Sequence, residues 1–140
     1  MLINPLPMPP KQKIILFADD DLDDQELLKE AFLKIDDQLI IHTETTGKDA
    51  LSFLEQCSDQ DLPGLIILDY NIPDMNGAEI FELINSNIRY RNIVKVVWST
   101  SNSPLYRQIC KDAGIDHYFE KPQRYQEILK LGQKMLELIV

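Results

Sequence analysis

Three short apolar runs and a shorter fourth segment each end on a charged or hydroxyl-bearing residue. These segments and the residues that end them are 14–18 with Asp19, 65–68 with Asp69, 94–98 with Ser99, and 117–120 with Lys121. Continuous apolar runs that contain β-branched residues are typical of strands buried on both faces of a parallel sheet. Because ligand sites in such sheets lie at the carboxyl ends of the strands, we expect these end residues to meet at one edge.

Segments with helical spacing of apolar residues alternate with the predicted strands. The strands are predicted at 13–18, 39–45, 64–68, 93–98 and 115–119. The helices are predicted at 23–35, 47–54, 80–84, 102–113 and 124–139. Regular alternation of this kind predicts an α/β fold, with a doubly wound five-stranded parallel sheet and helices on both faces.

Length and charge limit the classes of protein to which the chain can belong. Its 140 residues suit one domain with a sizeable core, and a net charge of −9 argues against a nucleic-acid surface. No apolar run approaches the length of a membrane span, and residues 1–12 lack the pattern of a secretory signal. We therefore expect a mobile lead-in over 1–12, one domain over 13–140, a cytoplasmic location, and neither nucleic-acid nor membrane partners.

Aspartates dominate the segment that follows the first predicted strand. Converging carboxylates of Asp19, Asp20 and Asp69, without cationic partners, would repel one another, and a hard divalent cation such as Mg²⁺ relieves that repulsion. The alternative is a solvated helix N-terminus, where the helix dipole favours acidic side chains. We expect that second role for Asp23 and Asp24, and metal binding for the other three.

Asp69 has two interpretations on sequence alone. It is either a turn residue at the end of a strand or a nucleophile that forms an aspartyl-phosphate. The second role requires neutralisation of the phosphoryl charge, for which Lys121 offers an ammonium and Ser99 a hydroxyl. Pro122 keeps Lys121 out of helical geometry and so fixes its direction at the strand end.

Four motifs together resemble the receiver domain of two-component response regulators, of the stand-alone type similar to the chemotaxis regulator. The motifs are ILFADDD at 15–21, LDYNIPDMNG at 68–77, STS at 99–101 and EKP at 120–122. The similarity spans about residues 13–139. The distances along the chain also match such domains, with 30 residues from Asp69 to Ser99 and 52 from Asp69 to Lys121.

The resemblance implies a flavodoxin-like sheet with strand order 2-1-3-4-5. It also implies that Asp69 is the phospho-acceptor. Mg²⁺ would be held by the carboxylates of Asp19, Asp20 and Asp69 and by the main-chain carbonyl of Asn71, directly or through water.

Further roles follow from the same resemblance. Lys121 would pair with one phosphoryl oxygen, and Ser99 would hydrogen-bond another. Tyr118 matches an aromatic switch residue that turns inward as the hydroxyl moves toward the phosphate. Trp98 is bulky for its position, so we expect it to limit the room for that rotation.

A receiver domain would take its phosphoryl group from a sensor histidine kinase or a histidine phosphotransfer protein. It would hydrolyse the group itself and signal to an unknown downstream protein through a surface near the fourth helix and fifth strand. Such a protein is a signalling receiver rather than an enzyme for diffusible substrates.

Two alternatives remain: a small Mg²⁺-dependent phosphohydrolase with Asp69 as nucleophile, and a flavodoxin-like cofactor binder. Against the first, the chain has no Asp-x-Asp motif at the nucleophile and no cap domain for a substrate pocket, and the acidic loop after the first strand disfavours the second.

Overall fold

A computed structural model describes residues 13–115 and 117–139. Their strands are β1 (Ile14–Ala18), β2 (Ile40–Glu44), β3 (Leu65–Asp69), β4 (Val94–Ser99) and β5 (His117–Glu120). Their helices are α1 (Leu22–Ile35), α2 (Gly47–Gln56), α3 (Gly77–Asn85), α4 (Pro104–Asp112) and α5 (Tyr125–Glu137), with the short 3₁₀ turns η1 (Asp59–Asp61) and η2 (Ile88–Tyr90). The predicted lead-in, residues 1–12, lies outside the described residues.

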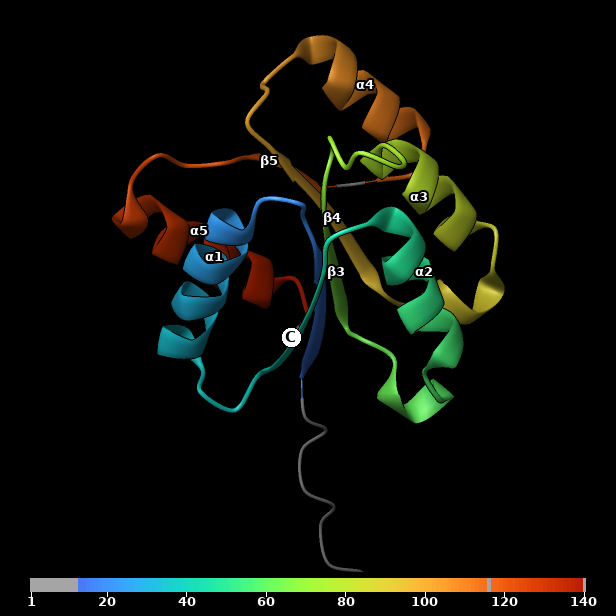
Figure 1. The fold of residues 1–140 in the computed structure, drawn as a ribbon, viewed down its shortest axis with the longest axis horizontal. Helices are drawn as coiled ribbons and strands as arrows, with labels where there is room; N and C mark the ends of the chain where they lie inside the picture. Colours follow the sequence, from blue (N-terminus) through green and yellow to red (C-terminus); the bar gives the residue numbers. More distant parts are fainter. Residues whose placement is uncertain (1–12, 116, 140) are drawn as a thin grey trace, which may run out of the picture.

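All pairings between the strands are parallel, and the order across the sheet is β2-β1-β3-β4-β5. The helices α1 and α5 cover one face of this sheet, and α2, α3 and α4 cover the other (Figure 1). This arrangement confirms the predicted doubly wound sheet and its strand order. All carboxyl ends of the strands therefore lie at one edge of the sheet.

Two apolar layers hold the helices on the sheet, because successive side chains of a strand point to opposite faces. In β1, Leu16 packs on the side of α2, α3 and α4, whereas Phe17 packs on the side of α1 and α5. The closing helix α5 buries Ile128, Leu131 and Met135 in the second layer. The apolar face of α5 is thus part of the core.

The ends of the elements differ from the predicted ones by a few residues. Helix α1 begins one residue earlier, at Leu22, because the Asp21 side chain accepts hydrogen bonds from two N–H groups of its first turn. Helix α4 begins at Pro104, and the Ser103 side chain makes no cap hydrogen bond. After α4, Gly114 has a φ of 83°, a conformation that a side chain would strain. This glycine therefore ends the helix where the sequence predicts.

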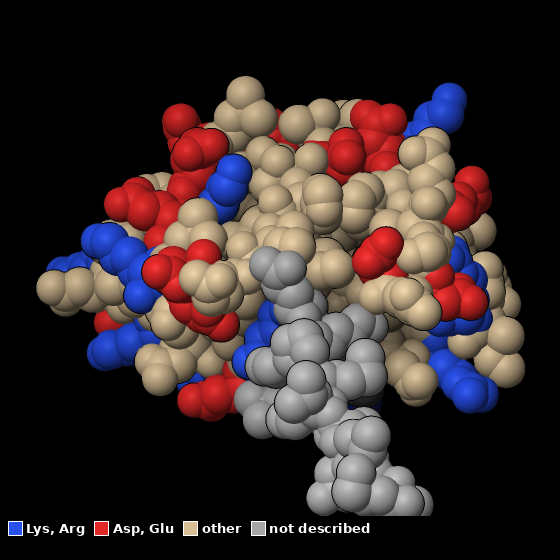
Figure 2. Space-filling view, turned by 90° about the horizontal axis from the view of Figure 1, so that it is seen from below, with Lys and Arg blue, Asp and Glu red and all other residues tan. Residues whose placement is uncertain are grey.

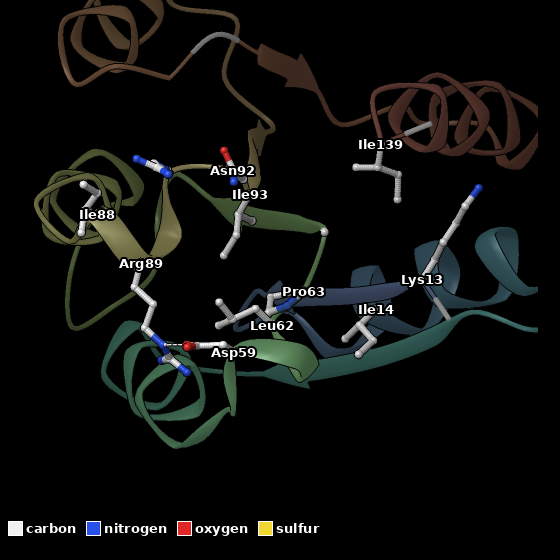
Figure 3. Close-up of a pocket in the computed structure, with 12 residues that line it drawn as sticks. Lys13, Ile14, Asp59, Leu62, Pro63, Ile88, Arg89, Asn92, Ile93 and Ile139 are labelled. Carbon is white, nitrogen blue, oxygen red and sulfur yellow. Dashed lines mark hydrogen bonds and ion pairs between the residues drawn. The ribbon is translucent and has the colours of Figure 1, made fainter. Parts of the chain in front are cut away.

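The opposite edge of the sheet, at the amino ends of the strands, holds a hollow of about 670 Å³ between Ile14, Ile93 and Ile139. An ion pair between Arg89 and Asp59, with nitrogen and oxygen 2.6 Å apart, lies in its wall (Figure 3). Figure 2 shows this end of the molecule, where acidic and basic side chains are interspersed. Among the described helices, none combines the length and apolar character needed to cross a membrane.

Candidate functional site

The loop after β1 places two acidic side chains at the carboxyl edge of the sheet. Asp19 is fully buried, and Asp20 is exposed. The side-chain amide of Gln25, a buried residue of α1, donates to the main-chain carbonyls of Asp19 at 2.6 Å and Glu44 at 2.8 Å. Gln25 therefore ties this loop to the end of β2. Sequence reasoning missed it because its contacts are to backbone atoms.

Three carboxylates meet at this edge. Oxygen atoms of Asp19, Asp20 and Asp69, here named the carboxylate cluster, all lie within 4.8 Å of one another. Asp69 ends β3, which pairs with β1, and is 6% exposed. Oxygen ligands at this spacing, one of them reaching solvent, suit a hard cation such as Mg²⁺ that retains several waters. The structure brings the three predicted residues together, while their binding of metal stays a prediction.

Lys121 follows β5 and extends its ammonium to the carboxylate cluster. Its Nζ lies 2.8 Å from Asp19 Oδ2, 2.8 Å from Asp24 Oδ2 and 3.1 Å from Asp69 Oδ2, and its side chain is 8% exposed. A hydrogen bond from the Lys121 N–H to the Ser99 carbonyl, 2.7 Å long, fixes where the side chain leaves the strand end. The chain itself therefore supplies a cation to these carboxylates, which lowers the repulsion on which the argument for a metal was based.

Asp24 has a different role from the one expected. The sequence predicts a solvated acid at the start of α1, which describes the exposed Asp23. The Asp24 side chain instead pairs with Lys121 and is 28% exposed. The two partners are 97 residues apart, so no local pattern in the sequence indicates their contact.

Trp98 lies beside the same charged groups. Its Nε1–H donates to Asp19 Oδ2 at 3.1 Å, and the Lys121 Nζ lies 4.9 Å from the centre of its ring. The ring packs on the side of α1 and α5, whereas Tyr118 packs on the opposite side with α2, α3 and α4. The expectation that Trp98 limits rotation of Tyr118 is therefore wrong.

Burial and hydrogen bonding act in opposite directions on the ionised groups. Burial raises the pKa of Asp19 to about 7, against the lowering effect of its hydrogen bonds with Lys121 and the Asp21 N–H. Burial alone would lower the pKa of Lys121, but hydrogen bonds to Asp19 and Asp24 raise it above its ordinary value. Lys121 therefore stays charged and provides a fixed positive charge beside Asp69.

Ser99 and Tyr118, the predicted switch residues, both bond to Ser101 in the loop between β4 and α4. The Oγ of the fully buried Ser99 accepts a hydrogen bond from the Ser101 N–H at 3.1 Å. The Tyr118 hydroxyl donates to the Ser101 carbonyl at 2.6 Å, and burial raises its pKa. The Arg107 guanidinium lies 4.6 Å from the centre of the Tyr118 ring. Their action as a switch stays a prediction.

The loop after β3 is closed against the strand end. An antiparallel bridge joins Asn71 to Asn76, and the Asn71 N–H donates to Asp69 Oδ1 at 3.2 Å. A Cβ at Gly77 would lie 3.2 Å from the main-chain oxygen of Asp69, so a side chain there would crowd the strand end. Asp74 accepts hydrogen bonds from the first two N–H groups of α2, both at 2.9 Å. The Asn71 carbonyl as a metal ligand stays a prediction.

The sequence of residues 15–132 matches the family of the response regulator receiver domain. The chain belongs to this family. It is therefore a receiver domain of two-component signalling, as its four motifs predict, and the phosphohydrolase alternative is disfavoured.

Relatives of the chain include response regulators from a plant and a cyanobacterium. The two-component response regulator ARR9 of Arabidopsis thaliana is 29% identical over 140 residues, which cover 88% of this chain and 59% of ARR9. Response regulator Rcp1 of Synechocystis is 30% identical over 126 residues, which cover 86% of this chain and 84% of Rcp1. The chain thus spans about three fifths of the plant protein and most of the cyanobacterial one.

Solved structures of similar proteins agree with this assignment. The phosphorylated cyanobacterial phytochrome response regulator RcpA superposes with a TM-score of 0.82 at 25% identity, over 91% of this chain and 94% of RcpA. The Mn²⁺-bound form of Rcp1 gives a TM-score of 0.75 at 27% identity, over 87% of this chain and 90% of Rcp1. The fold of the described residues is therefore the receiver fold.

Proposed function

We propose that this receiver accepts a phosphoryl group on Asp69 from a phosphohistidine of a sensor histidine kinase or a histidine phosphotransfer protein. The observation that carries the proposal is the contact between Asp69 and Lys121, with oxygen and nitrogen 3.1 Å apart at a buried strand end. A surface carboxylate with no fixed cation nearby would lack the charge that phosphoryl transfer requires.

In the proposed reaction, a carboxylate oxygen of Asp69 attacks the phosphorus atom. A phosphorus–oxygen bond forms while the phosphorus–nitrogen bond of the phosphohistidine breaks, and the departing imidazole takes up a proton. In the later hydrolysis, water attacks the phosphorus, the phosphorus–oxygen bond to Asp69 breaks, and inorganic phosphate leaves. Lys121 is positioned to neutralise phosphoryl charge in both steps.

The carboxylate cluster fits a divalent cation, which we propose to be Mg²⁺. Asp19, Asp20 and Asp69 would hold it with the Asn71 main-chain carbonyl, and when bound it would supply further neutralisation of the phosphoryl oxygens. The exposed side chain of Asp20 leaves one side of the cluster open to solvent and to the phosphodonor. The relative Rcp1 has been solved in a form bound to Mn²⁺, another divalent cation, which supports the proposal by analogy.

Signalling would then pass through protein contacts at α4 and β5. Ser99 ends β4; its Oγ accepts from the Ser101 N–H, and its O–H would donate to a phosphoryl oxygen, so movement of this hydroxyl toward the phosphoryl group would also shift Ser101. Tyr118 bonds to the same loop, so a shift of Ser101 changes the place where its hydroxyl is held. The partner at that surface would be a protein that binds differently to the position of this loop before phosphorylation and to its position afterwards.

Incubation with a small phosphodonor and Mg²⁺, followed by intact-mass measurement, tests the proposal. We expect one phosphoryl group per chain, labile to hydroxylamine, and none in Asp69→Asn, which keeps the shape of the side chain but removes the nucleophile. Asp20→Ala should slow labelling at ordinary Mg²⁺ concentrations. Labelling of Asp69→Asn to the level of the wild type would contradict the assignment of the acceptor.

A further inference from the structure

The Lys121 ammonium has three N–H donors, and the site offers three carboxylate oxygens to receive them. Asp19 Oδ2 and Asp24 Oδ2 lie at 2.8 Å from Nζ, and Asp69 Oδ2 lies at 3.1 Å. With 8% of its side chain exposed, Lys121 has little access to water. Every donor is therefore engaged before a phosphoryl group arrives, and a new acceptor must displace an existing one.

The three partners differ in how firmly the structure holds them. Asp19 is fully buried, and its carboxylate also receives the Trp98 Nε1–H and the Asp21 N–H. Asp69 is the proposed acceptor itself. Asp24 lies outside the carboxylate cluster, and 28% of its side chain is exposed, so water can replace Lys121 as its partner.

We propose that Asp24 is a positioning residue that holds one N–H donor of Lys121 away from the phosphoryl site in the unphosphorylated protein. The role rests on the proposed function, because it is exerted on the lysine that would bind the phosphoryl group. When Asp69 is phosphorylated, its carboxylate charge is lost and its bond to Lys121 weakens; as the ammonium then moves toward the phosphoryl oxygens, the bond to the partly exposed Asp24 breaks, whereas the bond to the buried Asp19 is kept. Asp24 thereby opposes phosphorylation and favours return of Lys121 after hydrolysis.

The direction of the effect distinguishes this role from a supporting one. An acid that only orients Lys121 toward the phosphoryl group would weaken phosphoryl binding when it is removed. An acid that competes for the lysine strengthens phosphoryl binding when it is removed. A hydrogen bond between charged groups that are partly exposed changes an equilibrium by about threefold to tenfold, which sets the expected size.

The experiment measures binding of beryllofluoride, a phosphoryl mimic, to the full chain at a Mg²⁺ concentration that saturates each variant. Trp98 is the single tryptophan and lies 4.9 Å from the Lys121 ammonium, so its fluorescence reports the binding. Asp24→Ala is compared with Asp23→Ala. The control removes an equal charge from the same helical turn but leaves the partners of Lys121 unchanged. Asp24→Asn, which keeps the side-chain shape, provides a second variant of the same position.

We expect Asp24→Ala to bind beryllofluoride about threefold to tenfold more tightly than the wild type, and Asp23→Ala to bind as the wild type does. In a Lys121→Ala background the same change at Asp24 should have no effect, because its action passes through the lysine. Unchanged or weaker binding by both Asp24 variants would overturn the role, as would equal strengthening by Asp23→Ala. Failure of the wild type to bind beryllofluoride with Mg²⁺ would contradict the proposed function itself.

Discussion

Removing the Lys121 ammonium should destabilise the fold when no divalent cation is present. Lys121→Met keeps the aliphatic part of the side chain beside Trp98 but leaves the buried carboxylates of Asp19 and Asp69 without their cation. Removal of one partner from a buried ion pair costs about 3–5 kcal/mol. Because Asp24 is partly exposed and can be hydrated, we expect a loss near the lower end, about 3 kcal/mol, in the free energy of unfolding.

Urea unfolding in the presence of a chelator, and again with excess Mg²⁺, measures this loss. Mg²⁺ should restore much of the stability of Lys121→Met, because a cation that binds only the folded state at 100 times its dissociation constant adds about 2.7 kcal/mol. Lys130→Met is the matched control, since Lys130 is 76% exposed and its pair with Glu127 spans 3.7 Å. That control should change stability by less than about 1 kcal/mol. Equal losses in the two variants, or a loss in Lys121→Met that Mg²⁺ leaves unchanged, would refute the reasoning.

Two further predictions concern the loop after β3. Hydrogen bonds from the first two N–H groups of α2 outweigh burial and lower the pKa of Asp74 below its ordinary value of 3.8. Asp74→Ala should therefore cost about 1 kcal/mol of unfolding free energy at pH 7, and the difference from wild type should vanish as the pH falls through that lowered pKa. Gly77→Ala should cost about 1–2 kcal/mol, because its Cβ would lie 3.2 Å from backbone atoms of both Asp69 and Tyr70. The midpoints of urea unfolding, compared at an unchanged m-value, measure the stability loss of each variant. An increase in the stability of Gly77→Ala would show that the backbone of Asp69 and Tyr70 accommodates the added methyl group, against this prediction.

The sheet could be predicted from the sequence because its strands are buried on both faces. In β3, Ile66, Ile67 and Leu68 have no exposed surface, so the strand is continuously apolar rather than alternating. The polar residues that end such strands are then conspicuous, which is why Asp69 stands out in the sequence. The strand order came from the resemblance to receiver domains, since apolar runs alone do not indicate which strands are neighbours.

The partners of the ionised groups could not be predicted in the same way. Asp24 has the position and type of an ordinary acid in a first helical turn, and only the folded chain brings it to Lys121. The separation of Trp98 from Tyr118 follows from the pairing of β4 with β5. Tyr118 lies opposite Val97, so these two side chains share one face of the sheet, and Trp98, the residue after Val97, points to the other face. That inference requires the register, which the sequence does not provide.

The charges of the candidate site are separated by most of the chain. Lys121 contacts Asp19 and Asp69, which precede it by 102 and 52 residues. During synthesis the carboxylates are therefore made before the lysine that neutralises them, and contacts of such long range are slow to form because closing a long loop costs entropy. A nascent chain synthesised only as far as β4 has the carboxylates, which repel one another, but has neither β5 nor Lys121 to neutralise them. Under the proposed function, competence to receive a phosphoryl group would arise only when β5 has joined the sheet, so phosphorylation of Asp69 would also report that this last strand is in place.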